Sequence, residues 1–366
     1  MADDAQVILS SPVAVASALA GMSPDERASW RTAEVPGRPS AAERGLEKLP
    51  FPYGWFPAML SSELGAGEVK PLRYFGRDLV IWRGEDGRPR MLDAHCRHLG
   101  AHMGHGGRVV GQLLECPFHA WRYDGEGVAR EVPYAERIPP SLTRPCERQW
   151  PLAEANRMIW FWHHPESKAP AWEVADFPEA SDPDWRDYEV HEWRVFGALQ
   201  NMAENAVDVA HFKYVHGTAT FPTSEMIWDG VRRTSIIAFE SETPNGRVDS
   251  RVEARMIGPG QSATRFTGIA ETLLVAAVTP VERDEVRVRF CFTQPKAQTE
   301  GLSAMAAQGF IWEVCRQLDQ DKVIWDRQRY LERPIVCDGD GPILRFRKWY
   351  SQFYAEWAEG PRAAVS

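Results

Sequence analysis

Two cysteine–histidine pairs constrain the fold of this chain more than any other feature. Cys96-x-His98 and Cys116-x-x-His119 are separated by 17 residues, so each of two short loops offers one thiolate and one imidazole. Zinc accepts two cysteines and two histidines as well, but a zinc finger places both cysteines before both histidines. A sulfur and a nitrogen from each loop instead favour a 2Fe–2S cluster in which one iron takes both thiolates and the other both imidazoles.

The composition indicates a globular protein with room for two domains. The chain has 366 residues, and a domain typically takes roughly 100–200. Hydrophobic residues at 44% and charged residues at 25% exclude extensive disorder. The net charge of −9 argues against binding to nucleic acid or to anionic membranes, and six cysteines are too few for a disulfide scaffold. The 15 tryptophans indicate large buried aromatic surfaces or an apolar ligand cavity.

The N-terminal region gives no sign of a targeting signal. Met1-Ala2-Asp3-Asp4 is acidic where a secretory signal carries positive charge, and the chain has no apolar run of about 20 residues that could span a membrane. We therefore expect a cytoplasmic protein with reduced thiols. Residues 1–50 are rich in Ala, Ser, Pro and charge without a sustained period, which predicts a loosely ordered N-terminal arm.

The rest of the chain divides into two predicted domains. Short β-like runs broken by glycine fill 51–165 and predict a small antiparallel β domain that carries the cysteine–histidine pairs. A proline-rich linker, 165–183, leads into a second, catalytic domain at 166–366. There, alternating runs across 231–293 predict half-buried antiparallel strands, and 303–332 predicts a long amphipathic helix. The predicted fold class is α+β, with the catalytic sheet flanked by helices.

A second group of metal-ligating residues lies between Glu204 and His216. On one helix, Glu204, Asp208 and His211 would fall within about 60° of one another. His216 would lie about 140° from His211, so the two can share a metal only if the helix ends or bends before His216, and Gly217 is a plausible stop. The alternative is a core helix whose histidines are satisfied by hydrogen bonds.

The long predicted helix carries a carboxylate in an unexpected place. Asp321 lies within the apolar stripe that runs along 311–325. Asp319 and Asp326 fall about 160° and 140° away, on the face expected to be solvated. An unpaired carboxylate in an apolar stripe is costly unless it meets a cation or a metal.

Together with two histidines, such a carboxylate forms the facial triad of non-haem Fe(II) oxygenases. We therefore predict that His211, His216 and Asp321 bind a mononuclear iron. The alternative for Asp321 is a salt bridge to Arg316 or Arg327.

The spacing of these motifs resembles a known family. The two cysteine–histidine pairs, with Pro117-Phe118 and Trp121 beside the second, look like a Rieske iron–sulfur domain, in which His95, His102 and His105 are expected to be polar loop residues. A Rieske centre followed by Asp-x-x-His-x₄-His resembles the oxygenase component of the Rieske non-haem iron oxygenases, over about residues 50–360.

The resemblance implies a role for each candidate residue. The cluster ligands would be Cys96, His98, Cys116 and His119, and the mononuclear iron ligands His211, His216 and Asp321. Asp208 would link the Rieske histidine of one subunit to the iron ligand of the next, which implies a head-to-tail homotrimer. Electrons would come from a separate NAD(P)H-dependent reductase or ferredoxin and would pass through His119 and Asp208 to activate dioxygen.

Further motifs narrow the resemblance. Residues 133–139, 340–343 and 347–354 look like the steroid-acting branch, which includes the 3-ketosteroid 9α-hydroxylase oxygenase and cholesterol 7-desaturase. This implies hydroxylation or desaturation of an apolar steroid or sterol. Apolar side chains of the predicted strands could line a site for it: Phe239, Phe266, Leu273, Leu274, Val275 and Phe290.

Two other functions remain open at this point. An aromatic ring-hydroxylating Rieske dioxygenase would carry the same two metal sites. A Rieske electron-transfer protein would not need the roughly 200 residues that follow the cluster motif, nor their second set of metal ligands.

Overall fold

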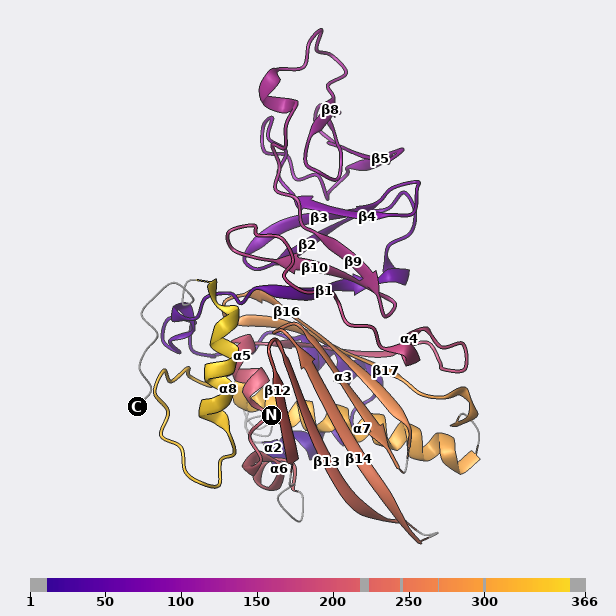
Figure 1. Ribbon diagram of the computed structural model, residues 1–366, viewed down its shortest axis with the longest axis vertical. Helices are drawn as coiled ribbons and strands as arrows, with labels where there is room; N and C mark the ends of the chain where they lie inside the picture. The colour runs from indigo at the N-terminus through magenta and orange to yellow at the C-terminus, as the bar shows by residue number, and fades with distance from the viewer. Residues whose placement is uncertain (1–11, 218–223, 244–245, 269, 299–300, 356–366) are drawn as a thin grey trace. The chain divides into compact units, whose positions relative to one another are not determined.

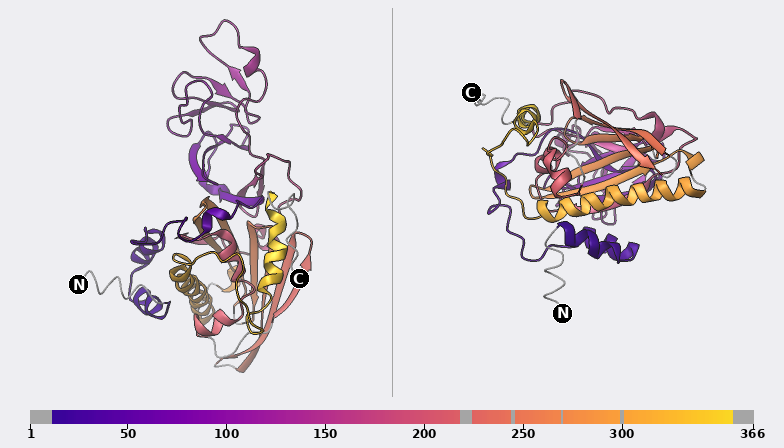
Figure 2. Two further views of the ribbon diagram at one scale, coloured as in Figure 1. Left: turned by 90° about the vertical axis from the view of Figure 1, so that its left-hand side faces the viewer. Right: turned by 90° about the horizontal axis from the view of Figure 1, so that it is seen from below.

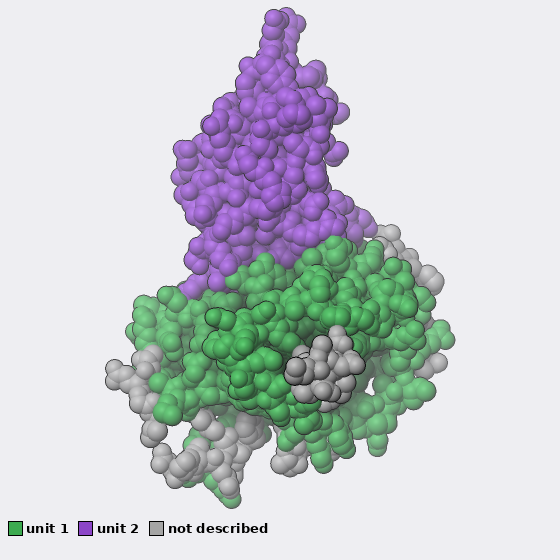
Figure 3. Space-filling view, turned by 180° about the vertical axis from the view of Figure 1, so that it is seen from behind, with its two compact units in different colours: residues 1–53, 177–366 green, residues 54–176 purple. Residues whose placement is uncertain are grey.

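The computed structural model describes residues 12–217, 224–243, 246–268, 270–298 and 301–355 (Figure 1). The chain divides into two compact units, one formed by 54–176 and the other by the segments on either side of it, 1–53 and 177–366 (Figure 3). The fold is α+β, as the sequence predicts. Among the described residues, no helix is long and apolar enough to cross a membrane.

Unit 54–176 consists of three small antiparallel sheets, in the orders β1-β10-β9, β2-β3-β4 and β5-β6-β7-β8. The strands are β1 (Gly54–Leu60), β2 (Val69–Tyr74), β3 (Arg77–Arg83), β4 (Pro89–Asp93), β5 (Arg108–Val110), β6 (Leu113–Glu115), β7 (Arg122–Tyr123), β8 (Ala129–Glu131), β9 (Leu152–Ala155) and β10 (Met158–His163). Trp82, Leu92 and Leu114 form a buried core that also includes Cys96 and Cys116. The packed strands thus bury both cysteines in the core of this unit.

The boundary of this unit differs from the expected position at residue 165. Two indole N–H groups donate to the proline-rich segment, Trp162 to the Lys168 carbonyl at 2.9 Å and Trp55 to the Trp172 carbonyl at 2.6 Å. These bonds, together with the one from Asn156 to the Ala175 carbonyl, tie the segment to the β domain. It is therefore not a free linker, and the unit extends to Asp176.

The second unit is built on a seven-stranded antiparallel sheet in the order β11-β17-β16-β15-β14-β13-β12. The strands are β11 (Glu189–Val195), β12 (Ser224–Asp229), β13 (Arg232–Thr243), β14 (Gly246–Ile257), β15 (Gln261–Thr267), β16 (Thr272–Glu282) and β17 (Glu285–Thr293). The helices are α2 (Pro12–Ala20), α3 (Pro24–Thr32), α4 (Pro178–Ser181), α5 (Leu199–Glu204), α6 (Ala210–Tyr214), α7 (Gly301–Trp325) and α8 (Ile343–Tyr350).

Helix α7 lies along one face of this sheet. The ring of Phe310 on α7 contacts Phe266 of β15 edge-on, with centroids 4.7 Å apart. The indole N–H of Trp193 on β11 donates to Asp319 of α7 at 2.6 Å. Figure 2 shows that α7 runs between the sheet and the N-terminal helices.

Residues 12–48 differ from the loosely ordered arm that the sequence predicts. Ser23 caps the N-terminus of α3 with a capping box to Glu26, and Val15 and Leu19 of α2 pack against Val323 of α7. The arm covers the side of α7 that faces away from the sheet. The residues before Pro12 lie outside the described part of the chain.

This cover overturns the prediction that Asp319 and Asp326 are solvated. Asp319 is buried and forms two hydrogen bonds with the guanidinium of Arg31 on α3, at 2.7 and 2.8 Å. Asp326 is buried as well and pairs with Lys322 at 2.7 Å. At these positions α7 is covered both by the arm and by β11 and the residue after it, since Trp193 donates to Asp319 and the Phe196 N–H donates to Asp326.

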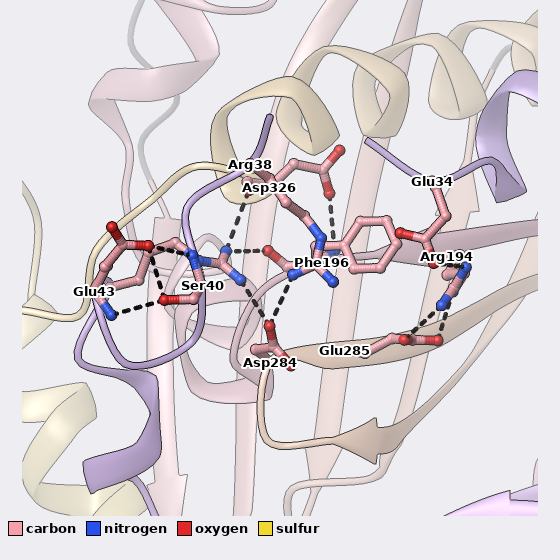
Figure 4. A network of polar contacts seen from close by, with 10 residues as sticks. Glu34, Arg38, Ser40, Glu43, Arg194, Phe196, Asp284, Glu285 and Asp326 are labelled. Carbon is pink, nitrogen blue, oxygen red and sulfur yellow. Dashed lines mark hydrogen bonds and ion pairs between the residues drawn. The ribbon is translucent and has the colours of Figure 1, made fainter. Parts of the chain in front are cut away.

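The segment after α3 is held by a further polar network (Figure 4). Arg44 is buried and donates to the backbone carbonyls of Phe196 and Asp326, and its guanidinium also pairs with Asp284 at 3.1 Å. The Asp326 carboxylate accepts the backbone N–H of Phe196 at 2.8 Å. The arm, the end of α7 and the end of β11 are therefore joined by buried hydrogen bonds.

Replacing Arg31 by Met should lower the free energy of unfolding by about 3–5 kcal/mol, because Asp319 would remain charged and buried without its partner. Urea unfolding followed by tryptophan fluorescence measures the change. The double variant Arg31→Met/Asp319→Leu should recover much of the loss, since it buries no unpaired charge. An equal loss in the single and double variants would contradict a specific role for the ion pair.

Candidate metal centres

Two tight loops present the cysteine–histidine pairs of the β domain. Cys96 follows β4, and the Gly100 N–H donates to its carbonyl at 2.8 Å. Cys116 follows β6 directly, and the Ala120 N–H donates to its carbonyl at 3.1 Å. Gly100 and Ala120 both have positive φ, +76° and +58°, which turns each loop sharply back. The two loops are built alike and place both cysteines in the core.

The histidines of the two loops meet. The rings of His98 and His119 are 4.6 Å apart between centroids, and the Trp121 ring stacks on His98 at 4.6 Å with an interplanar angle of 5°. His98 Nδ1 is buried and has no hydrogen-bond partner. An imidazole nitrogen without a partner, beside a second imidazole and two buried cysteines, fits the donor set of a Rieske cluster.

The cysteine sulfurs lie in an apolar setting with one polar neighbour. The Tyr123 hydroxyl is 3.1 Å from Cys96 Sγ. Burial raises the pKa of the Cys96 thiol to about 11, so metal binding is needed to stabilise the thiolate here. A hydroxyl donating to a cluster sulfur is one of the ways in which a protein sets the reduction potential.

Two of the three other histidines in this loop, His95 and His102, form side-chain hydrogen bonds. His95 Nε2 is 3.1 Å from an Asp78 carboxylate oxygen, and His102 Nδ1 accepts the Gly104 N–H at 3.1 Å. His102 and His105 lie side by side, with centroids 4.5 Å apart.

The catalytic unit brings together the three residues predicted as a facial triad. One ligand atom from each of His211, His216 and Asp321 lies within 4.8 Å of the others. His216 Nε2 is 3.5 Å from Asp321 Oδ1. Two imidazoles and one carboxylate in this arrangement can bind one divalent cation and leave other coordination positions open.

Each histidine is oriented by a hydrogen bond on its Nδ1. His211 Nδ1 donates to the Asp208 backbone carbonyl at 2.6 Å, and His216 Nδ1 donates to Gln320 Oε1 at 3.0 Å. These bonds leave Nε2 of both rings for a metal. The Asn205 amide donates to Asp321 Oδ2 at 2.9 Å, which orients the carboxylate and leaves Oδ1 on the side of His216.

The protonation of the two histidines is set by burial and by Asp321. Burial lowers the pKa of His211, which favours the neutral imidazole that a metal ligand requires. Burial also acts to lower the pKa of His216, but the hydrogen bond to Asp321 raises it overall. A bound cation would compete with the proton at this position.

The single helix considered for Glu204 to His216 is interrupted. Helix α5 ends at Glu204 and α6 begins at Ala210, so the three-residue face of Glu204, Asp208 and His211 does not form. Glu204 instead pairs with Arg347 at 2.7 Å. Helix α6 ends before His216, as sharing a metal requires, and Gly217 has a φ of +77°.

The alternative salt bridge of Asp321 is not formed within the described residues. Arg316 pairs with Glu313 on its own helix, at 2.5 Å. Asp208 is also placed differently from a helix-face acid: its side chain is about one-third exposed and accepts the backbone N–H groups of Ala210 and His211, so it caps α6.

Three residues around these centres were not assigned a role from the sequence. Tyr123 approaches a cluster cysteine, Asn205 orients Asp321, and Gln320 orients His216. The only available signal was that Gln320 belongs to a run of polar residues next to Asp321 within an apolar stripe. Tyr123 and Asn205 are ordinary residues in their local sequence.

Replacing Tyr123 by Phe should lower the reduction potential of the cluster, on the order of tens of millivolts, because the O–H would no longer stabilise negative charge on Cys96 Sγ. A redox titration followed by visible absorption measures the shift. Tyr134→Phe is the matched control, since its hydroxyl accepts the Trp121 N–H rather than contacting a sulfur. Equal potentials in wild type and Tyr123→Phe would contradict this role.

Comparison with known proteins finds relatives for both units. Residues 54–143 match the Rieske [2Fe-2S] domain, and residues 161–354 match the 3-ketosteroid 9α-hydroxylase C-terminal domain. The probable 3-ketosteroid-9-alpha-monooxygenase oxygenase component of Rhodococcus rhodochrous is 31% identical over 330 residues, covering 84% of this chain and 80% of that protein. Cholesterol 7-desaturase of Xenopus laevis is 30% identical over 339 residues, covering 83% and 72%.

A solved structure shows the same fold. Dicamba monooxygenase bound to 3,6-dichlorosalicylic acid superposes with a TM-score of 0.69 at 21% identity, covering 84% of this chain and 98% of that one. The first matched segment contains the four predicted cluster donors and the second the three residues of the predicted triad. The chain therefore belongs to the Rieske non-haem iron oxygenases, in the branch that contains the oxygenase component of 3-ketosteroid 9α-monooxygenase and cholesterol 7-desaturase.

Proposed function

We propose that this oxygenase hydroxylates or desaturates a steroid or sterol-like substrate, with electrons from a separate NAD(P)H-dependent reductase or ferredoxin. The observation that carries the proposal is the match of residues 161–354, which include His211, His216 and Asp321, to the 3-ketosteroid 9α-hydroxylase C-terminal domain. Both named relatives act, by their names, on a ketosteroid or a sterol.

Two sets of residues would hold the metal groups. Cys96, His98, Cys116 and His119 would bind the 2Fe–2S cluster, and His211, His216 and Asp321 would bind Fe(II). When bound, the cluster supplies single electrons and the iron supplies dioxygen chemistry. The protein's own contribution is to fix the Nε2 atoms of both histidines and one oxygen of Asp321 toward a common point, through Asp208, Gln320 and Asn205.

The face of the sheet toward α7 suits an apolar substrate. Ala254, Thr264, Phe266, Ala276 and Phe290 lie on this face in the middle of the sheet, yet all are only partly buried. Apolar side chains left partly accessible beneath a helix offer contact area to a hydrocarbon ligand.

The side chains that the sequence predicts to line the substrate site lie on both faces of the catalytic sheet. Phe266, Leu274 and Phe290 lie on the face toward α7, whereas the register places Leu273 and Val275 on the opposite face. The side chain of Phe239 lies outside the described residues. Strand alternation explains the division, because consecutive residues point to opposite sides of a sheet.

The test of this function is oxygen uptake coupled to product formation, with a surrogate reductase supplied. The substrates are a ketosteroid, cholesterol and a compact aromatic acid such as salicylate. Metal analysis first verifies about two cluster irons and one further iron per chain, as the two ligand sets require. We expect coupled turnover with a steroid or sterol. Turnover of the aromatic acid alone would favour the aromatic-hydroxylating alternative and overturn the steroid assignment.

Asp208 is proposed to link the two metal centres across subunits of a homotrimer. Replacing it by Asn should reduce turnover by about 10–100-fold through loss of the charge, while the melting temperature stays unchanged, because Asn caps a helix as well as Asp does. Asp208→Ala is the matched variant that should lose both the cap and turnover. Near-normal turnover in Asp208→Asn, measured by oxygen uptake, would show that Asp208 serves only as a helix cap.

A further inference from the structure

A buried arginine at one end of the catalytic sheet has no counter-charge among the described residues. Arg233 of β13 is 2% exposed. Its Nη1 donates to the Ala206 carbonyl at 3.3 Å, and its Nε is buried without a partner in the described part of the chain. Burial lowers the pKa of Arg233 to about 10, so the side chain is still charged at neutral pH. A buried charge without a partner is costly, and a protein that retains one commonly uses it.

A second unsatisfied donor lies directly opposite. Trp228 of β12 pairs with Arg233 in the antiparallel register, which places the two side chains next to each other on one face. The indole N–H of Trp228 is also buried without a partner. Both side chains lie beneath α8, where Trp228 contacts Trp349 at 5.7 Å and the Arg233 guanidinium lies 6.0 Å from the Phe346 ring. Two neighbouring donors thus have no acceptor within the ranges that the structure describes.

The arginine stands at the end of a row of side chains that crosses the sheet. The register joins Arg233 to Met256, Ser262, Ala276 and Phe290 on the same face. The last three are only partly buried, and this is the face along which α7 carries Asp321. One end of the row is cationic and its middle is small or apolar.

The guanidinium also reaches the segment that supports the iron site. Its acceptor, the Ala206 carbonyl, follows Asn205, whose side chain holds Asp321. Asp208, whose carbonyl orients His211, is two residues further on. The segment from Asn205 to Asp208 therefore connects the candidate metal centre to Arg233.

We propose that Arg233, together with the indole N–H of Trp228, binds a carboxylate at the end of an otherwise apolar substrate. This rests on the proposed function and narrows it, since the preferred substrate is then a steroid that carries an acid rather than a neutral sterol. A carboxylate would supply the missing counter-charge and accept from both donors, and its hydrocarbon body would lie along the row of partly buried side chains. Hydrogen bonds in which donor or acceptor is charged are stronger than those between neutral groups.

The test compares a ketosteroid whose side chain ends in a carboxylate with its methyl ester. Both are titrated into the anaerobic holoenzyme by calorimetry, so the readout is binding rather than turnover. The wild type should bind the acid about 10–100-fold more tightly than the ester, as a charged hydrogen-bonded pair implies. Arg233→Met should bind both equally, and Trp228→Phe should lose part of the preference.

The chain offers a matched control in Arg232. It has the same residue type on the same strand but is exposed, and it points to the opposite face. Arg232→Met should therefore keep the full preference for the acid. Should Arg233→Met fail to fold, judged by melting temperature and the visible spectrum of the cluster, Arg233→Lys replaces it. Arg233→Lys should show a reduced preference for the acid, because Lys keeps the positive charge but lacks the planar guanidinium that can form two hydrogen bonds with a carboxylate.

The possible failures are distinguishable. Equal binding of acid and ester by the wild type would contradict carboxylate binding by Arg233. A preference for the acid that persists in Arg233→Met would contradict it too. Both results would leave the steroid proposal intact. If neither steroid binds, but salicylate binds to the wild type and not to Arg233→Met, then Arg233 binds a carboxylate and the steroid assignment is wrong.

Discussion

The catalytic unit depends on helix α7, which packs against the sheet and, towards its C-terminal end, against the N-terminal arm. Four consecutive polar residues of α7, from Asp319 to Lys322, are buried, and each has a specific partner. Asp319 pairs with Arg31, Gln320 with His216, Asp321 with Asn205, and Lys322 with Asp326. A buried polar group without a partner costs about 1–3 kcal/mol, so rotation or sliding of α7 would break several of these bonds at once. These bonds fix the rotation of α7 about its own axis, so that Asp321 faces His211 and His216.

Much of the site could be predicted because its signals are local. The cluster donors lie within 24 residues, from Cys96 to His119, and their spacing alone indicates two similar loops. Asp321 could be found because helical periodicity applies to any helix, and a carboxylate in an apolar stripe calls for a cation. The end of α6 before His216 could be expected from the requirement that both histidines reach one metal. These inferences need no knowledge of distant contacts.

The remaining features depend on contacts between distant segments. Arg31 and Asp319 are 288 residues apart, and no local pattern in either segment indicates that they meet. For the same reason the sequence of the N-terminal arm resembles a disordered tail, because the partners that anchor it, such as Asp319 for Arg31, lie far away along the chain. The interruption between α5 and α6 coincides with a tertiary contact, since Glu204 at the end of α5 pairs with Arg347 of α8.

Buried donors without a partner occur at both candidate binding sites, although Arg44 of the arm network also has one, its Nε. The polar residues that hold α7 are satisfied, as expected of groups whose role is structural. His98 Nδ1 is an exception, and the neighbouring His119 and cysteines give a reason for it, because a metal would take that nitrogen. Arg233 and Trp228 are exceptions of the same kind, without a metal-ligating residue type between them. An acceptor from outside the described residues would satisfy both, and the apolar Met256, Ala276 and Phe290 on the same face indicate that the acceptor is attached to a hydrocarbon.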